Sequence, residues 1–171
     1  MAFILGLLAV IAFLLSFQFK SRRNIIAVNL ASRFLYIVQY HVLGAFEGAV
    51  LDFLGFVSSF IAKYKEKSFI AKNFKVIVIA VNVVVLAAGI ALYENIFSVF
   101  AILGIIFEIS ALWLTKEKNI RILSLIAAPF WLLYNIANGA YGSVIGNVLV
   151  MISIGIAMLR LDFKKNKKTE D

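Results

Sequence analysis

Residues 75–92 read KVIVIAVNVVVLAAGIAL, and after the first lysine the only polar side chain in this stretch is Asn82. A helix needs about 20 predominantly apolar residues to cross the hydrocarbon core of a bilayer. Similar stretches fill most of the chain, since 63% of its 171 residues are hydrophobic and only 15% are charged. A soluble domain of this size carries more charge and exposes less apolar surface. The composition therefore predicts an all-α membrane protein.

Short charged or glycine-containing segments divide the chain into seven expected membrane-spanning helices. We place these spans at residues 2–19, 25–43, 47–63, 75–92, 96–115, 122–139 and 143–161. The first span lacks the basic start and the small-residue cleavage site of a signal peptide, so we expect it to be retained.

The basic residues indicate how the spans are oriented. Sixteen of the 17 Lys and Arg residues fall in alternate connections and in the C-terminal tail, at 20–23, 63–75, 116–121 and 160–168. The other connections carry Glu47 and Glu94 and no basic residue. Cytoplasmic loops are enriched in Lys and Arg, so we expect the N-terminus outside and the C-terminus in the cytoplasm. The net charge of +8 then faces anionic lipid, and we expect no nucleic-acid partner.

Several kinds of chemistry are not expected from this sequence. The chain has no cysteine, which excludes disulfides. It has a single histidine, His41, so a metal site built from histidines is not expected. It contains no phosphate-binding loop, no H-E-x-x-H motif and no visible nucleophile–base pair. We therefore expect neither an enzyme nor a bound cofactor.

The chain contains an internal repeat. The turn GAFEG at residues 44–48 resembles GAYGS at 139–143, and a shift of 95 residues superimposes the two without a gap. The same shift places Tyr36 on Trp131 and Asp52 on Asn147. With the orientation above, this predicts two parallel three-helix bundles around a lone helix, an arrangement found in transporters. The expected units are 1–67, 68–94, 95–162 and a basic tail at 163–171.

Three segments carry a resemblance to known families. VIAFLL at 10–15, the aromatic run into Leu43-Gly44, and WLLYNIANG at 131–139 resemble the bacterial inner-membrane family called YgjV-like. The 3+1+3 plan, the outside N-terminus and the paired turns resemble the SWEET and PQ-loop (MtN3-like) superfamily of small-solute carriers. The resemblance implies a multi-pass protein of the bacterial inner membrane.

The SWEET resemblance also implies a binding site. In those carriers a tryptophan and an asparagine sixteen residues later line the sugar pocket, and Trp131 and Asn147 have this spacing. Tyr36 and Asp52 have the same spacing in the first half. SWEET carriers also use several prolines as hinges, whereas this chain has only Pro129.

Two charged residues are expected near the middle of the membrane. Arg33 lies roughly 13 Å into the second span and Glu108 roughly 18 Å into the fifth, at 1.5 Å per residue. A guanidinium stays protonated, so it must meet a carboxylate, an anion or water, and Glu108 is the expected partner. The pair is interpreted either as part of a substrate or coupling site or as a fixed structural ion pair, and a proton-coupled role for Glu108 is a further alternative. One face of the second span holds Asn29, Arg33, Tyr36 and Tyr40.

Polar and aromatic side chains on other spans extend this candidate site. Trp131, Tyr134 and Asn135 share a face of the sixth span, where an aromatic plate beside an amide suits a sugar or flat ring. Asp52 and Asn147 are expected either to bind a hydroxyl or amine of a solute or to bond a neighbouring helix. The residues expected to bind the solute are Arg33, Tyr36, Asp52, Glu108, Trp131, Tyr134, Asn135 and Asn147.

We therefore predict a facilitator that moves a small polar, sugar-like solute by alternating access between the two bundles. The alternatives are a vitamin-precursor carrier of the nicotinamide-riboside type and a non-transporting structural or accessory membrane protein. The expected partners are the solute and the lipid bilayer. A homodimer is also possible from the small-residue motif Gly142-xxx-Gly146.

Overall fold

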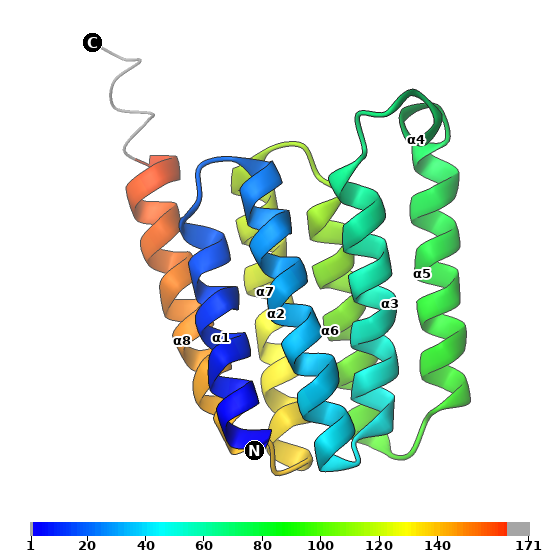
Figure 1. The fold of residues 1–171 in the computed structure, drawn as a ribbon, viewed down its shortest axis with the longest axis vertical. Coiled ribbons are helices and arrows are strands. Elements are labelled where there is room, and N and C mark those ends of the chain that lie inside the picture. Colours follow the sequence, from blue (N-terminus) through cyan, green and yellow to red (C-terminus); the bar gives the residue numbers. More distant parts are fainter. Residues whose placement is uncertain (1, 164–171) are drawn as a thin grey trace.

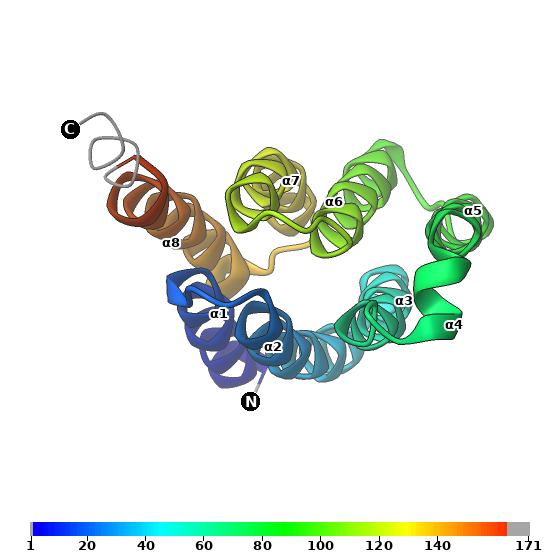
Figure 2. The same ribbon diagram turned by 90° about the horizontal axis from the view of Figure 1, so that it is seen from above.

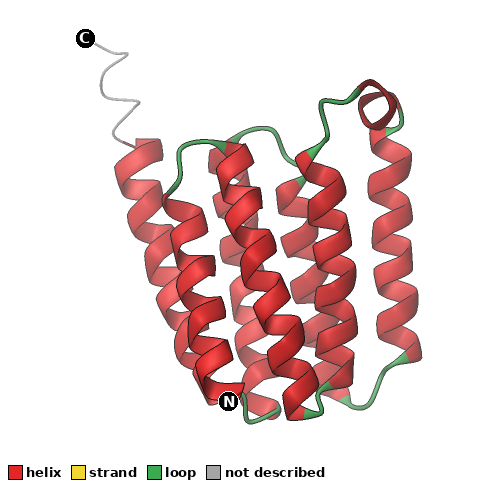
Figure 3. Cartoon of the chain, viewed as in Figure 1, coloured by secondary structure: helices red, strands yellow, loops and turns green. Residues whose placement is uncertain are grey.

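The computed structural model describes residues 2–163, which form helices joined by connecting segments, with no strand in this range (Figures 1 and 3). The elements are α1 (Ala2–Gln18), α2 (Arg22–Leu43), α3 (Phe46–Lys63), α4 (Ser68–Lys72), α5 (Phe74–Ala91), α6 (Ile96–Leu112), α7 (Glu117–Ala137), α8 (Tyr141–Met158) and a π-helical turn, η1 (Leu159–Phe163). The predicted all-α class is therefore confirmed for these residues.

The seven long helices run side by side, and their connections gather at two ends of the molecule (Figure 1). One end, which we call the basic end, holds the α1–α2 and α6–α7 connections, the α4 segment and the C-terminal end of α8. The other, the acidic end, holds the start of α1 and the α2–α3, α5–α6 and α7–α8 connections. Glu47 and Glu94 lie at the acidic end, where the sequence has no Lys or Arg.

Seen along the helices, the molecule forms two rows (Figure 2). The first row is α1, α2 and α3, and the second is α8, α7 and α6 in the facing order. Contacts between α1 and α8 close one edge, and α3 and α6 touch near the other. The α5 helix packs beside α3 and α6 at that second edge, outside the two rows.

The repeat seen in the sequence is reproduced in the local geometry of the two tight turns. Gly44 and Gly139 are 95 residues apart, and both adopt positive φ, 75° and 64°. Only glycine takes this left-handed conformation without a steric penalty, which explains its place at both helix ends. The α3 and α8 helices that follow are both 18 residues long and begin 95 residues apart.

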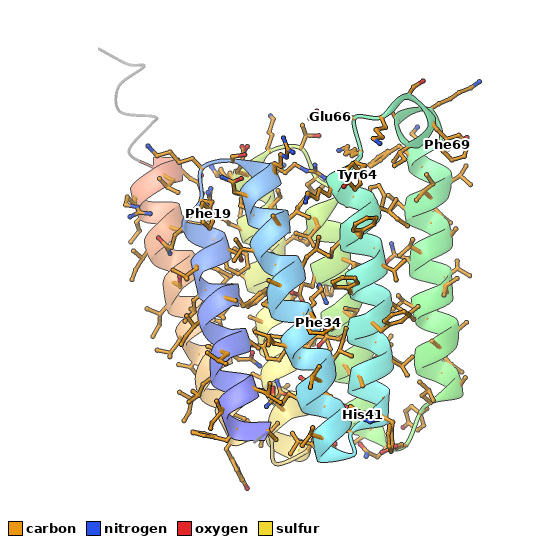
Figure 4. The ribbon with its side chains drawn as sticks, viewed as in Figure 1. Phe19, Phe34, His41, Tyr64, Glu66 and Phe69 are labelled. Carbon is orange, nitrogen blue, oxygen red and sulfur yellow. The ribbon has the colours of Figure 1, made fainter. Side chains whose placement is uncertain are left out.

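Side chains facing away from the rows are largely apolar. On α5, Val76, Ile79 and Ile90 are 64–69% exposed. Phe34 of α2, labelled at mid-height in Figure 4, is 59% exposed. A soluble monomer rarely exposes such continuous apolar surface, whereas lipid covers it at no cost.

The helices differ from the predicted spans in several places. Four of them, α2, α5, α7 and α8 with its η1 extension, meet the length and hydropathy expected of a membrane span, while α1 and α6 are apolar but only 17 residues long. The connection predicted at 63–75 contains the short helix α4. The helix of the fifth predicted span ends at Leu112 instead of residue 115, and basic side chains bind the carbonyls of Trp113 and Leu114 that follow it. The predicted basic tail lies, from residue 164 onward, outside the described residues.

Candidate functional site

Arg33 occupies the middle of the bundle, between two carboxylates. Its side chain is 1% exposed. Nη1 lies 2.7 Å from Asp52 Oδ1 of α3, and Nη2 lies 3.1 Å from Glu108 Oε1 of α6. Nε donates to Asn29 Oδ1 at 3.1 Å, one turn back on the same helix. Glu108 is therefore a partner of Arg33, as the sequence predicts. The closer partner is Asp52, which the sequence predicted to bind either the solute or a neighbouring helix, and in this structure it binds α2 through Arg33.

A glycine makes room for the guanidinium. A Cβ atom at Gly55 of α3 would overlap Arg33 and would lie 2.7 Å from Ile105 Cδ1 of α6. The missing side chain lets α2, α3 and α6 converge on Arg33. The ion cluster formed by Arg33, Asp52 and Glu108 thus joins both rows of helices.

Aromatic rings form a wall beside this cluster. Tyr36 and Tyr40 of α2 stack with ring centroids 6.2 Å apart, and Tyr40 stacks on Trp131 of α7 at 6.4 Å. Tyr134 packs edge-on against both Tyr40 and Trp131. The indole Nε1 of Trp131 donates to Glu108 Oε2 at 2.9 Å, so the aromatic wall is fixed to the ion cluster.

A cavity of about 30 Å³ lies between the aromatic wall and the ion cluster. This volume has room for water but is about tenfold below the range for small-molecule sites, so a solute can bind there only if the two rows move apart. The cavity is lined by Phe13, Ser32, Arg33, Tyr36, Tyr40, Asp52, Glu108, Trp131, Asn135 and Asn147. The amide Nδ2 of Asn147 is buried at this wall without a hydrogen-bond partner among the described residues.

The structure therefore brings seven of the eight predicted site residues to one cavity, and Tyr134 packs behind its aromatic wall. It adds Tyr40, Phe13 and Ser32 to the lining. Tyr40 shares the predicted face of α2, so spacing alone could have included it. Phe13 comes from α1, where no polar residue near the middle of the helix signalled a site.

Positions related by the 95-residue shift meet in this cavity. The Tyr40 hydroxyl donates a hydrogen bond to Asn135 Oδ1 at 2.8 Å, and these two residues are 95 positions apart in the sequence. The cavity also contains the related pairs Tyr36 with Trp131 and Asp52 with Asn147.

At the acidic end, polar contacts join the two rows of helices. Ser98 Oγ of α6 donates to Glu47 Oε2 of α3 at 3.0 Å. Ser143 Oγ of α8 donates to Gln39 Oε1 of α2 at 3.2 Å. Glu47 is 4% exposed, and its Oε1 has no hydrogen-bond partner among the described residues.

At the basic end, an apolar cluster separates the cavity from the surface. Its members come from α2, α6 and α7, and each is at most 8% exposed. They are Ile25, Ile26, Leu30, Ala111, Leu112 and Ile120. On α2 and α6 these buried residues lie between the residues that line the cavity and the basic end of the helices.

Two arginines, which we call the arginine ties, bridge the rows beyond that cluster. Arg22 of α2 donates to the carbonyl of Leu112, the last residue of α6, at 2.7 Å and to that of Leu114 at 3.0 Å. It also donates to the Ala62 carbonyl of α3 at 2.9 Å. Arg121 of α7 donates to the Phe19 carbonyl after α1 at 3.0 Å.

The ties satisfy carbonyl groups that a helix leaves without partners at its C-terminal end. Arg121 also bonds Asp162 Oδ1 of η1 at 2.8 Å, and Lys65 supports the Arg22 tie by donating to the Trp113 carbonyl at 2.6 Å. Burial lowers the pKa of Lys65, so this cation is partly withdrawn from water. From the sequence, these basic residues predicted only the orientation of the spans. Their hydrogen bonds could not be predicted, because every residue has a backbone carbonyl and none is distinguished in the sequence as the acceptor.

Two weaker predictions are also located. Gly142 and Gly146 face Phe3 and Val10 of α1 in the same chain, so this small-residue face is occupied and is not available to a second copy. His41 is exposed at the acidic end and packs edge-on against Phe46. Among residues 2–163, no group of three His, Cys, Asp or Glu side chains is placed to hold a metal ion.

Comparison with known proteins identifies the family. The profile of the Imp-YgjV family, described as a bacterial inner membrane protein, matches residues 1–165, so the chain belongs to this family. No curated protein and no solved structure matches the chain.

Proposed function

We propose that this member of the bacterial inner-membrane family Imp-YgjV moves a small polar solute across the membrane by alternating access. In this proposal the rows α1–α3 and α6–α8 are two parallel three-helix units, and α5 is the connecting span that gives them the same orientation. The N-terminus and the acidic end face outward, and the basic end faces the cytoplasm.

The observation that carries the proposal is the central cavity lined by corresponding residues of both bundles. Tyr36, Asp52 and Tyr40 from one bundle meet Trp131, Asn147 and Asn135 from the other. Carriers built from repeats place their binding site near the midplane at the interface of the repeats. The resemblance to SWEET-type carriers supports the same site through Trp131 and Asn147.

Alternating access requires each end of the interface to open in turn. The contacts that hold the acidic end are few hydrogen bonds between side chains, such as Ser98 to Glu47. The basic end is held by the apolar cluster and by the arginine ties. We propose that the structure is an occluded state and that release to the cytoplasm breaks both arginine ties.

Exchange of labelled solutes in liposomes containing the purified protein tests this function. The panel should include hexoses, polyols, nucleosides and nicotinamide riboside, which cover the sugar-like and vitamin-precursor alternatives. Trp131→Ala should lower exchange of the active solute at least about tenfold, the effect of losing ~1.4 kcal/mol of binding. Tyr141→Ala removes an aromatic ring that is 70% exposed on α8 and serves as the control.

A structural or accessory role is the second candidate, because Arg33 is held by two carboxylates and an amide. Such a cluster can serve only to fix α2, α3 and α6 together. If no solute exchanges in either direction while the protein remains folded, transport is wrong and this second role stands.

A further inference from the structure

We propose that the central cavity takes a small organic cation that also carries a hydroxyl or carbonyl oxygen. This inference rests on the proposed function, because the cavity of about 30 Å³ must widen as the two rows move apart before such a solute can bind. It names a class of solute that differs from the neutral sugars expected from the sequence.

The first argument is the charge of the buried cluster. Arg33 contributes one positive charge, and Asp52 and Glu108 contribute two negative charges within 3.1 Å of it. Among the described residues, no other Lys or Arg side chain lines the cavity. The three side chains are at most 8% exposed, and a net negative charge buried in this way costs free energy. One additional positive charge would therefore stabilise the cluster. A bound organic cation supplies that charge, and a proton is its competitor.

The second argument is the aromatic wall. Tyr36, Tyr40 and Trp131 form a continuous stack, and all three line the same cavity as the carboxylates. The faces of aromatic rings attract cations, most strongly where water is excluded. Sites for quaternary ammonium groups are built from such rings.

The third argument is the unpaired amide of Asn147. Its side chain is 7% exposed, and the buried Nδ2 lacks an acceptor among the described residues. A buried donor without a partner costs free energy that a ligand oxygen would recover. The cation therefore needs an oxygen within reach of α8 while its charged group lies near Asp52 and Glu108.

The approach from the acidic end favours the same class of solute. Glu94 is exposed at that end, Glu47 is 4% exposed beneath it, and the sequence has no Lys or Arg there. A surface that carries one sign of charge raises the local concentration of the opposite ion. Anions that approach from this end would meet repulsion at this surface and again at Asp52 and Glu108.

Pairs of probes that differ only in charge test the inference directly. Choline and its neutral isostere 3,3-dimethylbutan-1-ol form one pair, and 1-methylnicotinamide and nicotinamide form a second. Binding to the intact purified protein is measured by equilibrium dialysis and by quenching of tryptophan fluorescence. The cation of at least one pair should bind at least about tenfold more tightly than its neutral partner. Equal binding of cation and neutral partner in both pairs, or no binding of either cation, would overturn the inference.

Variants then locate the effect. Glu108→Gln keeps an acceptor for Trp131 Nε1 but leaves a neutral Arg33–Asp52 pair, so the charge preference should disappear. Glu66→Gln makes the same change at an exposed residue of the basic end and should preserve it. Tetramethylammonium, which lacks an oxygen, should bind more weakly than choline, and Asn147→Leu should remove that difference. If Glu108→Gln does not fold, the comparison of charged and neutral probes with the unmodified protein still decides the question.

The outcomes also separate this inference from the proposed function. A cation that binds with the stated preference but does not exchange across liposomes supports the site and contradicts transport. A neutral solute that exchanges without any preference for charge supports transport and contradicts the cation site.

Discussion

Arg33 shows how much one residue depends on its surroundings in this protein. A guanidinium stays charged, so the buried side chain must be compensated at every point of its environment. Asp52 and Asn29 accept hydrogen bonds from it, Glu108 pairs with Nη2 by charge without a hydrogen bond, and Gly55 provides the space. Each of these neighbours lies on α2, α3 or α6, so the cost of removing Arg33 falls on the carboxylates that remain.

Replacing Arg33 should therefore be more harmful than replacing the whole ion cluster. Arg33→Gln leaves Asp52 and Glu108 buried without a cation, and breaking a buried pair in this way costs about 3–5 kcal/mol. Adding Asp52→Asn and Glu108→Gln to the same protein should recover part of the loss. Thermal unfolding in detergent measures both effects, and a triple variant less stable than Arg33→Gln would contradict the explanation.

The space at Gly55 leads to a second prediction. Gly55→Ala places a Cβ against the Arg33 guanidinium and Ile105, and overpacking of this kind costs about 1–3 kcal/mol. Gly155→Ala on α8 is the matched control, because no atom lies within 4 Å of its added Cβ. In detergent, only the first substitution should lower the unfolding temperature. Similar unfolding temperatures for the two variants would show that the close approach at Gly55 is unimportant.

At the level of the helices, the two rows meet differently at their two ends. At the acidic end, side chains bond other side chains, as in the contact of Ser98 with Glu47. At the basic end, Arg22 and Arg121 bond the carbonyls at the ends of helices in the opposite row. The ties therefore act on whole helices, and they should control how often the basic end opens.

This role predicts the accessibility of the apolar cluster below the ties. Because the natural chain has no cysteine, Leu30→Cys introduces a single buried thiol, at a residue that is 8% exposed. Adding Arg22→Gln removes hydrogen bonds from a charged donor, each worth about 1.5–3 kcal/mol. The basic end should then be open more often, so a maleimide should label the introduced thiol about tenfold faster or more. Labelling for a series of times, followed by measurement of the mass shift, gives the rate.

The neighbouring residue provides the control for this experiment. Arg23 is exposed, and none of the described hydrogen bonds joins its side chain to the opposite row, so Arg23→Gln changes the charge of the same connection without removing a tie. If Arg23→Gln accelerates labelling as much as Arg22→Gln does, net charge rather than the tie controls the opening.

For the molecule as a whole, the placement of charge predicts the orientation in the membrane. A cysteine at position 94 should react with an impermeant maleimide in intact cells, because the proposed topology places the acidic end outside. A cysteine at position 67, in the basic α3–α4 connection, should react only after the membrane is permeabilised. Mass shifts of the purified variants report both reactions. The opposite pattern would invert the proposed topology.

The sequence predicts the helices better than it predicts how they face one another. Long apolar stretches such as residues 75–92 identify the spans because lipid demands a continuous apolar helix. The glycines at 44 and 139 identify the turns because positive φ demands glycine. Periodicity also places Arg33 and Tyr36 on one face, but it does not fix how α3 is rotated toward that face, so the bond of Asp52 with Arg33 could not be predicted.

The remaining gaps have an equally physical cause. Phe13 lines the cavity because α1 packs beside α2 and α8, and an apolar residue in an apolar helix gives no sign of such a position. The predicted fifth span was too long because hydropathy does not detect where Arg22 and Lys65 bind the chain that follows Leu112.

The use of carbonyl acceptors by the arginine ties has a consequence for genetics. Every amino acid carries the same carbonyl group, so substitutions at positions 19, 112 and 114 leave the acceptors of the ties in place. In a saturation screen that selects for a leaky basic end, hits that act on hydrogen bonding should concentrate at Arg22 and Arg121. The positions that supply the carbonyls should tolerate many residues of suitable size. The screen would therefore identify the two arginines but not the helix ends to which they bind.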